Sequence, residues 1–388
     1  MPLKIRRLAG ALLPHSDEAR DLRRRLTRAN EAIEYWKTRS ERRSAAVDRM
    51  KQELDAAKLR VQEAQSNATL RKRRELSPGV LEQMLVSRMA QRPRLPWEAG
   101  PAQEREGRLL QASDEYRTVV GDDEGRAAKL QRAEVSGVPW WLPRDEGRAG
   151  RSRKLQHQGF PLRAVLNTRE VSLGGIMLDL GANVGRTSIT RVLLGDVRAV
   201  YAAEPEPTNY ACLVQNVVEH GLRGFVLPDR VAIGAQRGEV NLRRSQYIGG
   251  HRLLNPARRQ RAPIETVPVQ LWPLDDWMAH VGVDADAISF VKVDTQGSEV
   301  NVLRGARALL ARRHVAWQLE LDPGLLVRAG ATVPELLGRV AQHFTHFIDM
   351  GPAAPGARVR LVRDLAGALD YVGGEHAKTD LLLYNAVG

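Results

Sequence analysis

The chain has 388 residues, of which 43% are hydrophobic and 27% are charged, and its formal net charge is +13. This composition excludes wholesale disorder, and no apolar run reaches the ~20 residues that a membrane span needs. A single cysteine, Cys212, forms no internal disulfide, and no Cys/His spacing resembles a zinc site, so we expect a cytoplasmic protein without a metal centre.

Residues 1–75 carry the first predicted element, a long basic helix. Apolar side chains recur there at alternating spacings of three and four, and no Pro or Gly interrupts the stretch between Pro14 and Pro78. This pattern is typical of a coiled coil, through which we expect a homo-oligomer; a single solvated charged helix is the alternative. Residues 161–388 hold 25 cations and 23 anions, so most of the excess charge lies ahead of them, available for a partner or an anionic surface.

Residues 76–160 are predicted to be a helical linker punctuated by Pro and Gly, with short helices over 80–89 and 104–110. Trp140 and Trp141 stand between two prolines in this stretch. Adjacent tryptophans are rarely left in water, so they either pack the linker onto the following domain or line a substrate cleft.

Residues 161–388 alternate short apolar runs with helical patterns. The runs at 176–180, 199–203, 289–293 and 315–319 lack a polar face, as strands of a covered parallel sheet do. Helical patterns lie at 208–220, 298–310 and 333–343. The alternation predicts a doubly wound, mostly parallel α/β domain.

A glycine turn and an acidic residue follow the first two of these strands. Gly181 and Gly185 are spaced as G-x-x-x-G, which fits neither a dinucleotide fingerprint nor a P-loop. Glu204 ends the next strand, where a carboxylate is placed to accept hydrogen bonds from ribose hydroxyls. Together they indicate a nucleoside ligand without phosphates, of which S-adenosylmethionine is the common one.

A second group of ionisable residues surrounds the strand at 289–293. Lys292 and Asp294 share one face of this strand, Glu299 opens the next helix, and Glu320 ends a further strand at the same edge of the sheet. Ionisable groups gathered at such an edge indicate a functional site. A buried ion network that only fixes the strands is the alternative.

Several ordered motifs of the C-terminal region resemble the FkbM family of S-adenosylmethionine-dependent methyltransferases. The matching runs are Met177–Ser188, Ala203–Asn209, Val231–Gly234, Leu274–Asp276, Val291–Glu299, Leu303–Gly305 and Asp380–Tyr384. The resemblance covers residues from about 160 to 388 and departs from the family pattern at Gln296, where Glu is often found. It implies a Rossmann-like class I methyltransferase that methylates a hydroxyl of a glycan or a natural product.

The resemblance also implies roles for individual residues. The residues expected to bind the cofactor are Asp179, Gly181, Ala182, Asn183 and Gly185 at its methionine part, Glu204 at its ribose and Ala232 at its adenine. Asp294, Lys292 and Glu320 are the candidates for orienting or deprotonating the acceptor hydroxyl, with His251 as a further candidate base. A nucleic-acid methyltransferase that uses the basic N-terminus and a non-catalytic coiled-coil scaffold are the alternative functions.

Overall fold

The computed structural model describes residues 24, 27, 116–121, 123–135, 138–144, 175–193, 195–245, 249–255, 265–350, 359–369, 372 and 378–385. The chain divides into two compact units, residues 1–75 and residues 76–388. Only Arg24 and Thr27 are described in the first unit, and both are helical. The predicted coiled coil and the helices predicted over 80–89 and 104–110 therefore lie outside the described residues. No helix in the described part of the chain is long and apolar enough to cross a membrane.

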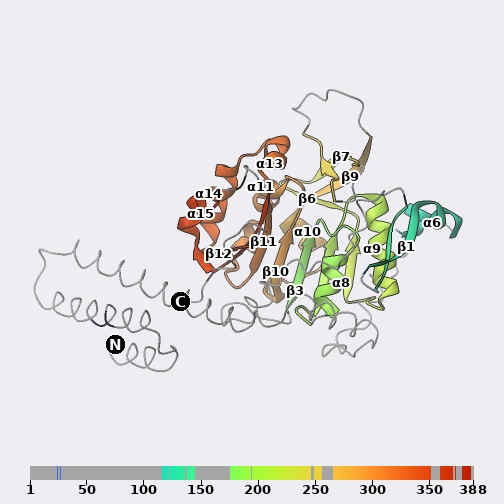
Figure 1. Cartoon of the computed structure of the whole chain (residues 1–388), viewed down its shortest axis with the longest axis horizontal. Helices are drawn as coiled ribbons and strands as arrows, with labels where there is room; N and C mark the ends of the chain where they lie inside the picture. Colours follow the sequence, from blue (N-terminus) through green and yellow to red (C-terminus); the bar gives the residue numbers. More distant parts are fainter. Residues whose placement is uncertain are drawn as a thin grey trace, which may run out of the picture. The chain divides into compact units, whose positions relative to one another are not determined.

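The described part of the second unit contains a central sheet with the order β13-β12-β14-β11-β10-β3-β4-β5 (Figure 1). Its strands are β3 (Ile176–Leu180), β4 (Ala199–Ala203), β5 (Val226–Asp229), β10 (Ile288–Val293), β11 (Ala316–Leu321), β12 (His346–Asp349), β13 (Val359–Leu361) and β14 (Thr379–Tyr384). Strands β5, β4, β3, β10 and β11 are parallel, whereas β14, β12 and β13 join antiparallel. The predicted, mostly parallel sheet is confirmed.

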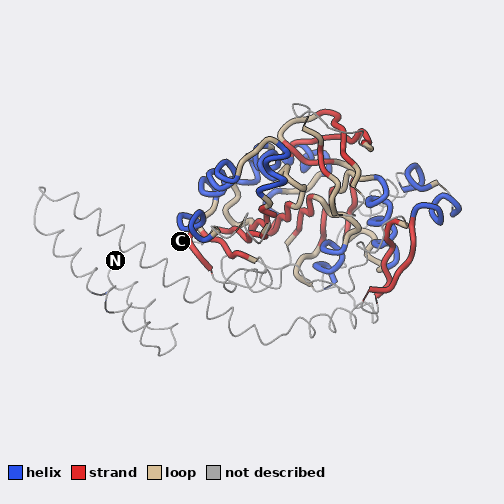
Figure 2. Tube along the Cα trace, turned by 45° about the horizontal axis from the view of Figure 1, so that its top comes forward, coloured by secondary structure: helices blue, strands red, loops and turns tan. Residues whose placement is uncertain are grey.

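Helices cover both faces of the central sheet (Figure 2). They are α8 (Arg186–Leu193), α9 (Pro207–Glu219), α10 (Leu274–Val281), α11 (Glu299–Arg304), α12 (Arg307–Leu310), α13 (Pro323–Ala329), α14 (Val333–His343) and α15 (Leu365–Ala368), with 3-10 turns η1 (Ala285–Ala287) and η2 (Val362–Asp364). The single helix predicted over 298–310 is split into α11 and α12 at Gly305. A Cβ on this glycine would lie 2.1 Å from the Gly234 carbonyl oxygen, so the chain passes this point only with glycine.

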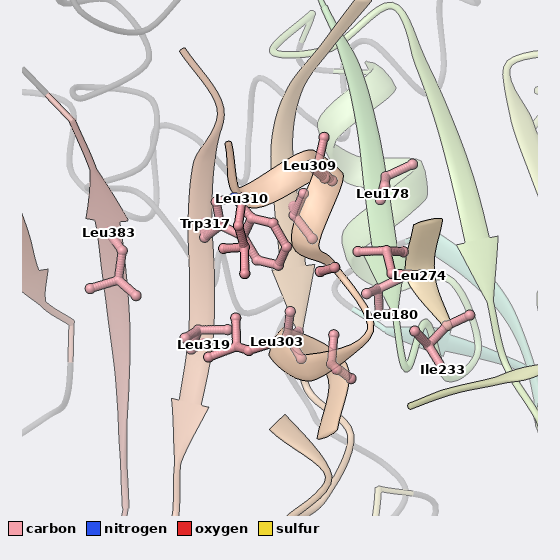
Figure 3. Packing of buried hydrophobic residues seen from close by; sticks show 14 of the residues in the cluster. Leu178, Leu180, Ile233, Leu274, Leu303, Leu309, Leu310, Trp317, Leu319 and Leu383 are labelled. Carbon is pink, nitrogen blue, oxygen red and sulfur yellow. The ribbon is translucent and has the colours of Figure 1, made fainter. Parts of the chain in front are cut away.

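The main hydrophobic core lies on one face of the sheet. Leu178 and Leu180 of β3 and Trp317 of β11 are fully buried there against α10, α11, α12 and α14 (Figure 3). The alternate residues of β3 point to the opposite face, where Ser188 of α8 donates a hydrogen bond to Asp179. Because these strands are buried on both faces, the apolar sequence runs that form them lack a polar side.

A second sheet is inserted between β5 and β10, with the order β6-β9-β7-β8. Its strands are β6 (Ala232–Gly234), β7 (Gly238–Arg243), β8 (Arg252–Leu253) and β9 (Thr266–Pro273). Strands β7 and β9 alternate exposed with half-buried residues, and Ala232, Leu242 and Val269 form a small core of their own. Our sequence prediction did not contain this sheet.

A β-hairpin occupies part of the stretch predicted to be a helical linker. Helix α6 (Asp123–Lys129) leads into β1 (Leu130–Val135), which pairs with β2 (Val138–Pro143). Alternate residues of β2 are buried, a two-residue period that excludes a helix over 138–143.

The two tryptophans of β2 pack this hairpin onto α9. Trp140 is fully buried against His220, with ring centroids 4.9 Å apart. Trp141 exchanges backbone hydrogen bonds with the Asn216 side chain, and its indole donates to Glu219. The packing interpretation of the tryptophans is thus confirmed, and neither of them lines the pocket described below.

Candidate functional site

A pocket opens at the carboxyl ends of β3, β4 and β10, where they face the second sheet. Its empty volume is about 610 Å³, a figure that includes space open to solvent. The lining residues are Gly181, Asn183, Ala203, Glu204, Pro205, Asn209, Val231, Ala232, Ile233, Leu242, Gly249, His251, Arg252, Leu253, Asp294, Thr295, Gln296 and Ser298. The pocket therefore lies at the carboxyl ends of the parallel strands, where the sequence predicted a ligand site.

The glycine turn between β3 and α8 forms one wall. Gly181 and Gly185 adopt φ of 84° and 86°, and Asn183 adopts 56°. An ideal Cβ on Gly181 would lie 2.0 Å from the Asp294 carbonyl oxygen, so glycine lets the turn pack directly against the end of β10. Gly181 and Asn183 line the pocket, whereas Ala182 and Gly185 shape the turn from behind.

Glu204 lies at the end of β4 and is 5% exposed. One oxygen, Oε2, accepts the Asn183 backbone N–H at 2.8 Å, and Oε1 accepts the Glu206 backbone N–H at 2.9 Å. Burial raises the pKa of Glu204 to about 8, although these two hydrogen bonds oppose the shift. A carboxyl group is thus held rigidly in the pocket wall with lone pairs left over for a ligand.

An apolar patch from the second sheet continues this wall. It consists of Ala232, Ile233, Leu242 and Leu253 of this sheet, with Val231 directly before β6, and all of them line the pocket together with Glu204. A carboxyl group near apolar side chains fits a ribose joined to a purine, so the described residues are suited to the nucleoside of S-adenosylmethionine.

Lys292 is 4% exposed and lies between two carboxylates. Its ammonium is 3.3 Å from Asp179 Oδ1 and 3.4 Å from Asp294 Oδ2, and it donates to the Gly181 carbonyl at 3.4 Å. Burial would lower the pKa of Lys292, but the charges of Asp179 and Asp294 outweigh it and raise the pKa. Neither Lys292 nor Asp179 lines the pocket; they form a buried ion network beneath the glycine turn.

Asp294 does reach the pocket, and Gln296 links it to Glu320. The Gln296 amide donates to Asp294 Oδ1 at 2.7 Å and to Glu320 Oε2 at 2.9 Å, while Lys378 pairs with the other Glu320 oxygen. Burial would raise the pKa of Asp294, but Lys292 and the Gln296 hydrogen bond together lower it. Burial and the neighbouring charge of Asp294 instead raise the pKa of Glu320 well above its ordinary value.

The three candidates at the β10 end of the site therefore differ in position. Asp294 lines the pocket, whereas Lys292 and Glu320 do not; Lys292 pairs with Asp294, and Glu320 is joined to it through Gln296. Glu299 begins α11, as the sequence predicted, and accepts hydrogen bonds from Thr295 and Gly297, which fixes the turn after β10.

Sequence reasoning placed Ala232 at the cofactor, but it missed the sheet that carries this residue, the wall contributed by Leu242 and Leu253, and the bridging role of Gln296. Gln296 adopts φ of 55°, a conformation that a non-glycine residue rarely takes and that no sequence pattern here signalled. Its departure from the family motif was the one available signal. The described residues contain no group of three or more His, Cys, Asp or Glu that could hold a metal ion.

Comparison with known protein families identifies one matching domain, which contains the pocket-lining residues. Residues 179–337 match the model of the methyltransferase FkbM domain. Among curated proteins, none matches the chain in sequence.

Solved structures resemble the chain only distantly. The FkbM methyltransferase of Methylobacillus flagellatus KT shares 14% identity at a TM-score of 0.35, over 72% of this chain and 60% of that chain. The TYW2 protein of M. jannaschii, in complex with AdoMet, shares 10% identity at a TM-score of 0.30, over 67% and 88%. The precorrin-6y C5,15-methyltransferase of Geobacter metallireducens GS-15 shares 9% identity at 0.30, over 58% and 88%. Scores this low support no inference about activity.

Proposed function

We propose that the chain, whose residues 179–337 match the methyltransferase FkbM domain, transfers the methyl group of S-adenosylmethionine to a hydroxyl of a glycan or natural-product acceptor. The observation that carries the proposal is Asp294. It is the carboxylate at the end of β10 that both faces the pocket and has a lowered pKa.

The cofactor supplies a methyl group already activated by its sulfonium. Glu204 accepts hydrogen bonds from the ribose hydroxyls, and Ala232 borders the adenine. The turn at Gly181–Gly185 holds the methionine part, with Asp179 supporting this turn from below through Lys292. These residues orient the cofactor toward the end of β10, where positioning supplies much of the rate.

Asp294 accepts the proton of the acceptor hydroxyl. A carboxylate with a low pKa is too weak to deprotonate an alcohol before the reaction, but it accepts a hydrogen bond from one. The hydroxyl would become strongly acidic as the methyl group passes from the sulfonium, which would be left as the neutral thioether of S-adenosylhomocysteine, to its oxygen; Asp294 would take the proton at that stage. Lys292 keeps Asp294 ionised, and the Gln296 amide with Glu320 keeps its carboxyl group in place.

The residues after β10 also favour a hydroxyl over a nucleic-acid base. The turn that lines the pocket reads Asp294-Thr-Gln-Gly297, without the N/D-P-P-Y/F loop that holds a planar base amine. The acceptor meets a hydrogen-bond-accepting carboxylate there instead of an aromatic clamp.

The test is to incubate the full chain with tritiated S-adenosylmethionine and, separately, with oligosaccharides, polyol natural products and tRNA. We expect label in a hydroxyl acceptor, and a rate about 100-fold lower for Asp294→Asn, the usual contribution of a positioned base. The matched control is Asp286→Asn, which removes an exposed carboxylate paired with Arg312 and should leave the rate unchanged. Label in tRNA alone would refute the proposal.

A further inference from the structure

His251 lines the pocket, but the proposed function gives this residue no role. It lies directly before β8, in the segment 249–253, which contributes four residues to the pocket wall. The side chain is half-buried, so its ring is held in the wall and does not extend freely into solvent.

The hydrogen bonding of the imidazole fixes which nitrogen carries the proton. Its Nδ1 lies 3.0 Å from the Ser245 backbone nitrogen, and a backbone N–H can only donate. Nδ1 is therefore an acceptor, and the ring hydrogen of neutral His251 is on Nε2. His251 is thus unsuited to the role of general base that the sequence allowed, because its lone pair is already engaged and its other nitrogen is a donor.

The charges around the ring are consistent with a neutral imidazole. Burial lowers the pKa of His251 below its ordinary value; Glu206 and Glu265 oppose this shift, and Arg244 adds to it. Arg244 bonds to Glu206 at 3.0 Å and also pairs with Glu265, so the two carboxylates near the ring are largely engaged by this guanidinium.

His251 lines the same pocket as Glu204, and residues on both sides of it lie close to those that hold Glu204. Arg244, at the start of the loop, binds Glu206, and an ideal Cβ on Gly249 would lie 3.7 Å from the Asn183 side chain. Asn183 and Glu206 are the same two residues whose backbone N–H groups hold the Glu204 carboxylate. The described residues at 244 and 249 therefore lie beside the part of the pocket that Glu204 occupies.

We propose that His251 donates an Nε2–H hydrogen bond to a ribose hydroxyl of the bound nucleoside, so that Glu204 and His251 hold the vicinal diol between an acceptor and a donor. This inference rests on the proposed function. Each hydroxyl can donate one hydrogen bond and accept others at once. Glu204 uses the donor capacity of the diol and His251 uses its acceptor capacity, which makes the pair selective for a ribose over a deoxyribose.

The test is calorimetric titration of the full chain with S-adenosylhomocysteine, which needs no acceptor. His251→Asn keeps an oxygen near the Nδ1 position for the Ser245 N–H but removes the distal donor. His251→Gln restores an amide N–H near the Nε2 position. We expect a three- to tenfold loss of affinity for His251→Asn, about the value of one neutral hydrogen bond, and a smaller loss for His251→Gln. His280→Asn, an exposed histidine of α10, is the matched control and should bind like the wild type.

A second titration separates this contact from a structural effect of the loop. Adenosine, 2′-deoxyadenosine and 3′-deoxyadenosine are compared on the wild type and on His251→Asn, with thermal melts to verify folding. We expect the wild type to bind one deoxy analogue more weakly than adenosine, and His251→Asn to lose most of that difference.

The outcomes distinguish the inference from its premise. If His251→Asn binds S-adenosylhomocysteine as tightly as the wild type, or keeps the full preference for adenosine, His251 does not contact the diol and the inference is wrong. If the folded wild type does not bind S-adenosylhomocysteine at all, the proposed function itself fails.

Discussion

Replacing Glu204 with Gln should change how the stability of the protein depends on pH. The pKa of Glu204 is raised from 4.5 to about 8 by burial, so between these values the native state holds a proton that the unfolded state has released. Stability is then greatest below pH 4.5 and is lost as the pH rises toward 8. The gap of three and a half pH units corresponds to about 5 kcal/mol.

The Gln side chain also lowers the free energy of unfolding by an amount that does not depend on pH. Both oxygens of Glu204 accept backbone N–H groups, whereas a carboxamide offers an oxygen to one of them and a second donor to the other. One lost hydrogen bond with an unsatisfied donor costs about 1–3 kcal/mol. Glu204→Gln should thus be less stable than the wild type near pH 5 and more stable near pH 9.

Urea unfolding of both proteins at pH 5, 7 and 9 measures this crossover. Glu239→Gln, which removes an exposed carboxylate from β7, is the control, and its difference from the wild type should stay within about 1 kcal/mol at every pH. If the difference between Glu204→Gln and the wild type is also constant across this range, Glu204 is not a buried, protonated carboxyl group and the reasoning fails.

Two further substitutions test the site. Gly181→Ala should abolish S-adenosylhomocysteine binding, because its Cβ would lie 2.0 Å from the carbonyl oxygen of Asp294. The control is Gly238→Ala, whose Cβ would have nothing within 4 Å and which should bind normally. Calorimetry measures both affinities, and tight binding by Gly181→Ala would contradict the packing of the turn. Lys292→Met should lower the free energy of unfolding by about 3–5 kcal/mol at pH 8, since it leaves buried Asp179 without a cation. A loss in urea of less than about 1 kcal/mol, the value of an exposed ion pair, would argue against the ion network.

The parallel strands could be predicted because burial on both faces leaves a direct sequence signal. Strands β3 and β4 were placed to the residue, and Asp294 and Glu320 were placed at one edge, because the strand ends of a parallel sheet meet there. What these carboxylates contact could not be predicted. The bridge between them depends on the left-handed backbone of Gln296.

The second sheet escaped prediction for a related reason. Strand β7 is mostly exposed, so it lacks the apolar run that marks the central strands. The donor role of His251 follows from a hydrogen bond to Ser245, six residues away, which only the folded loop brings into place.

The central claim is that this pocket binds S-adenosylmethionine through Glu204. Titrating the full chain with the cofactor by calorimetry, alongside Glu204→Ala, tests it most directly. We expect saturable binding of one cofactor per chain to the wild type, and at least tenfold weaker binding to a folded Glu204→Ala, because losing a hydrogen bond and leaving its partner unsatisfied costs about 1–3 kcal/mol. Equal affinity of the two proteins, or no binding by the folded wild type, would contradict the account.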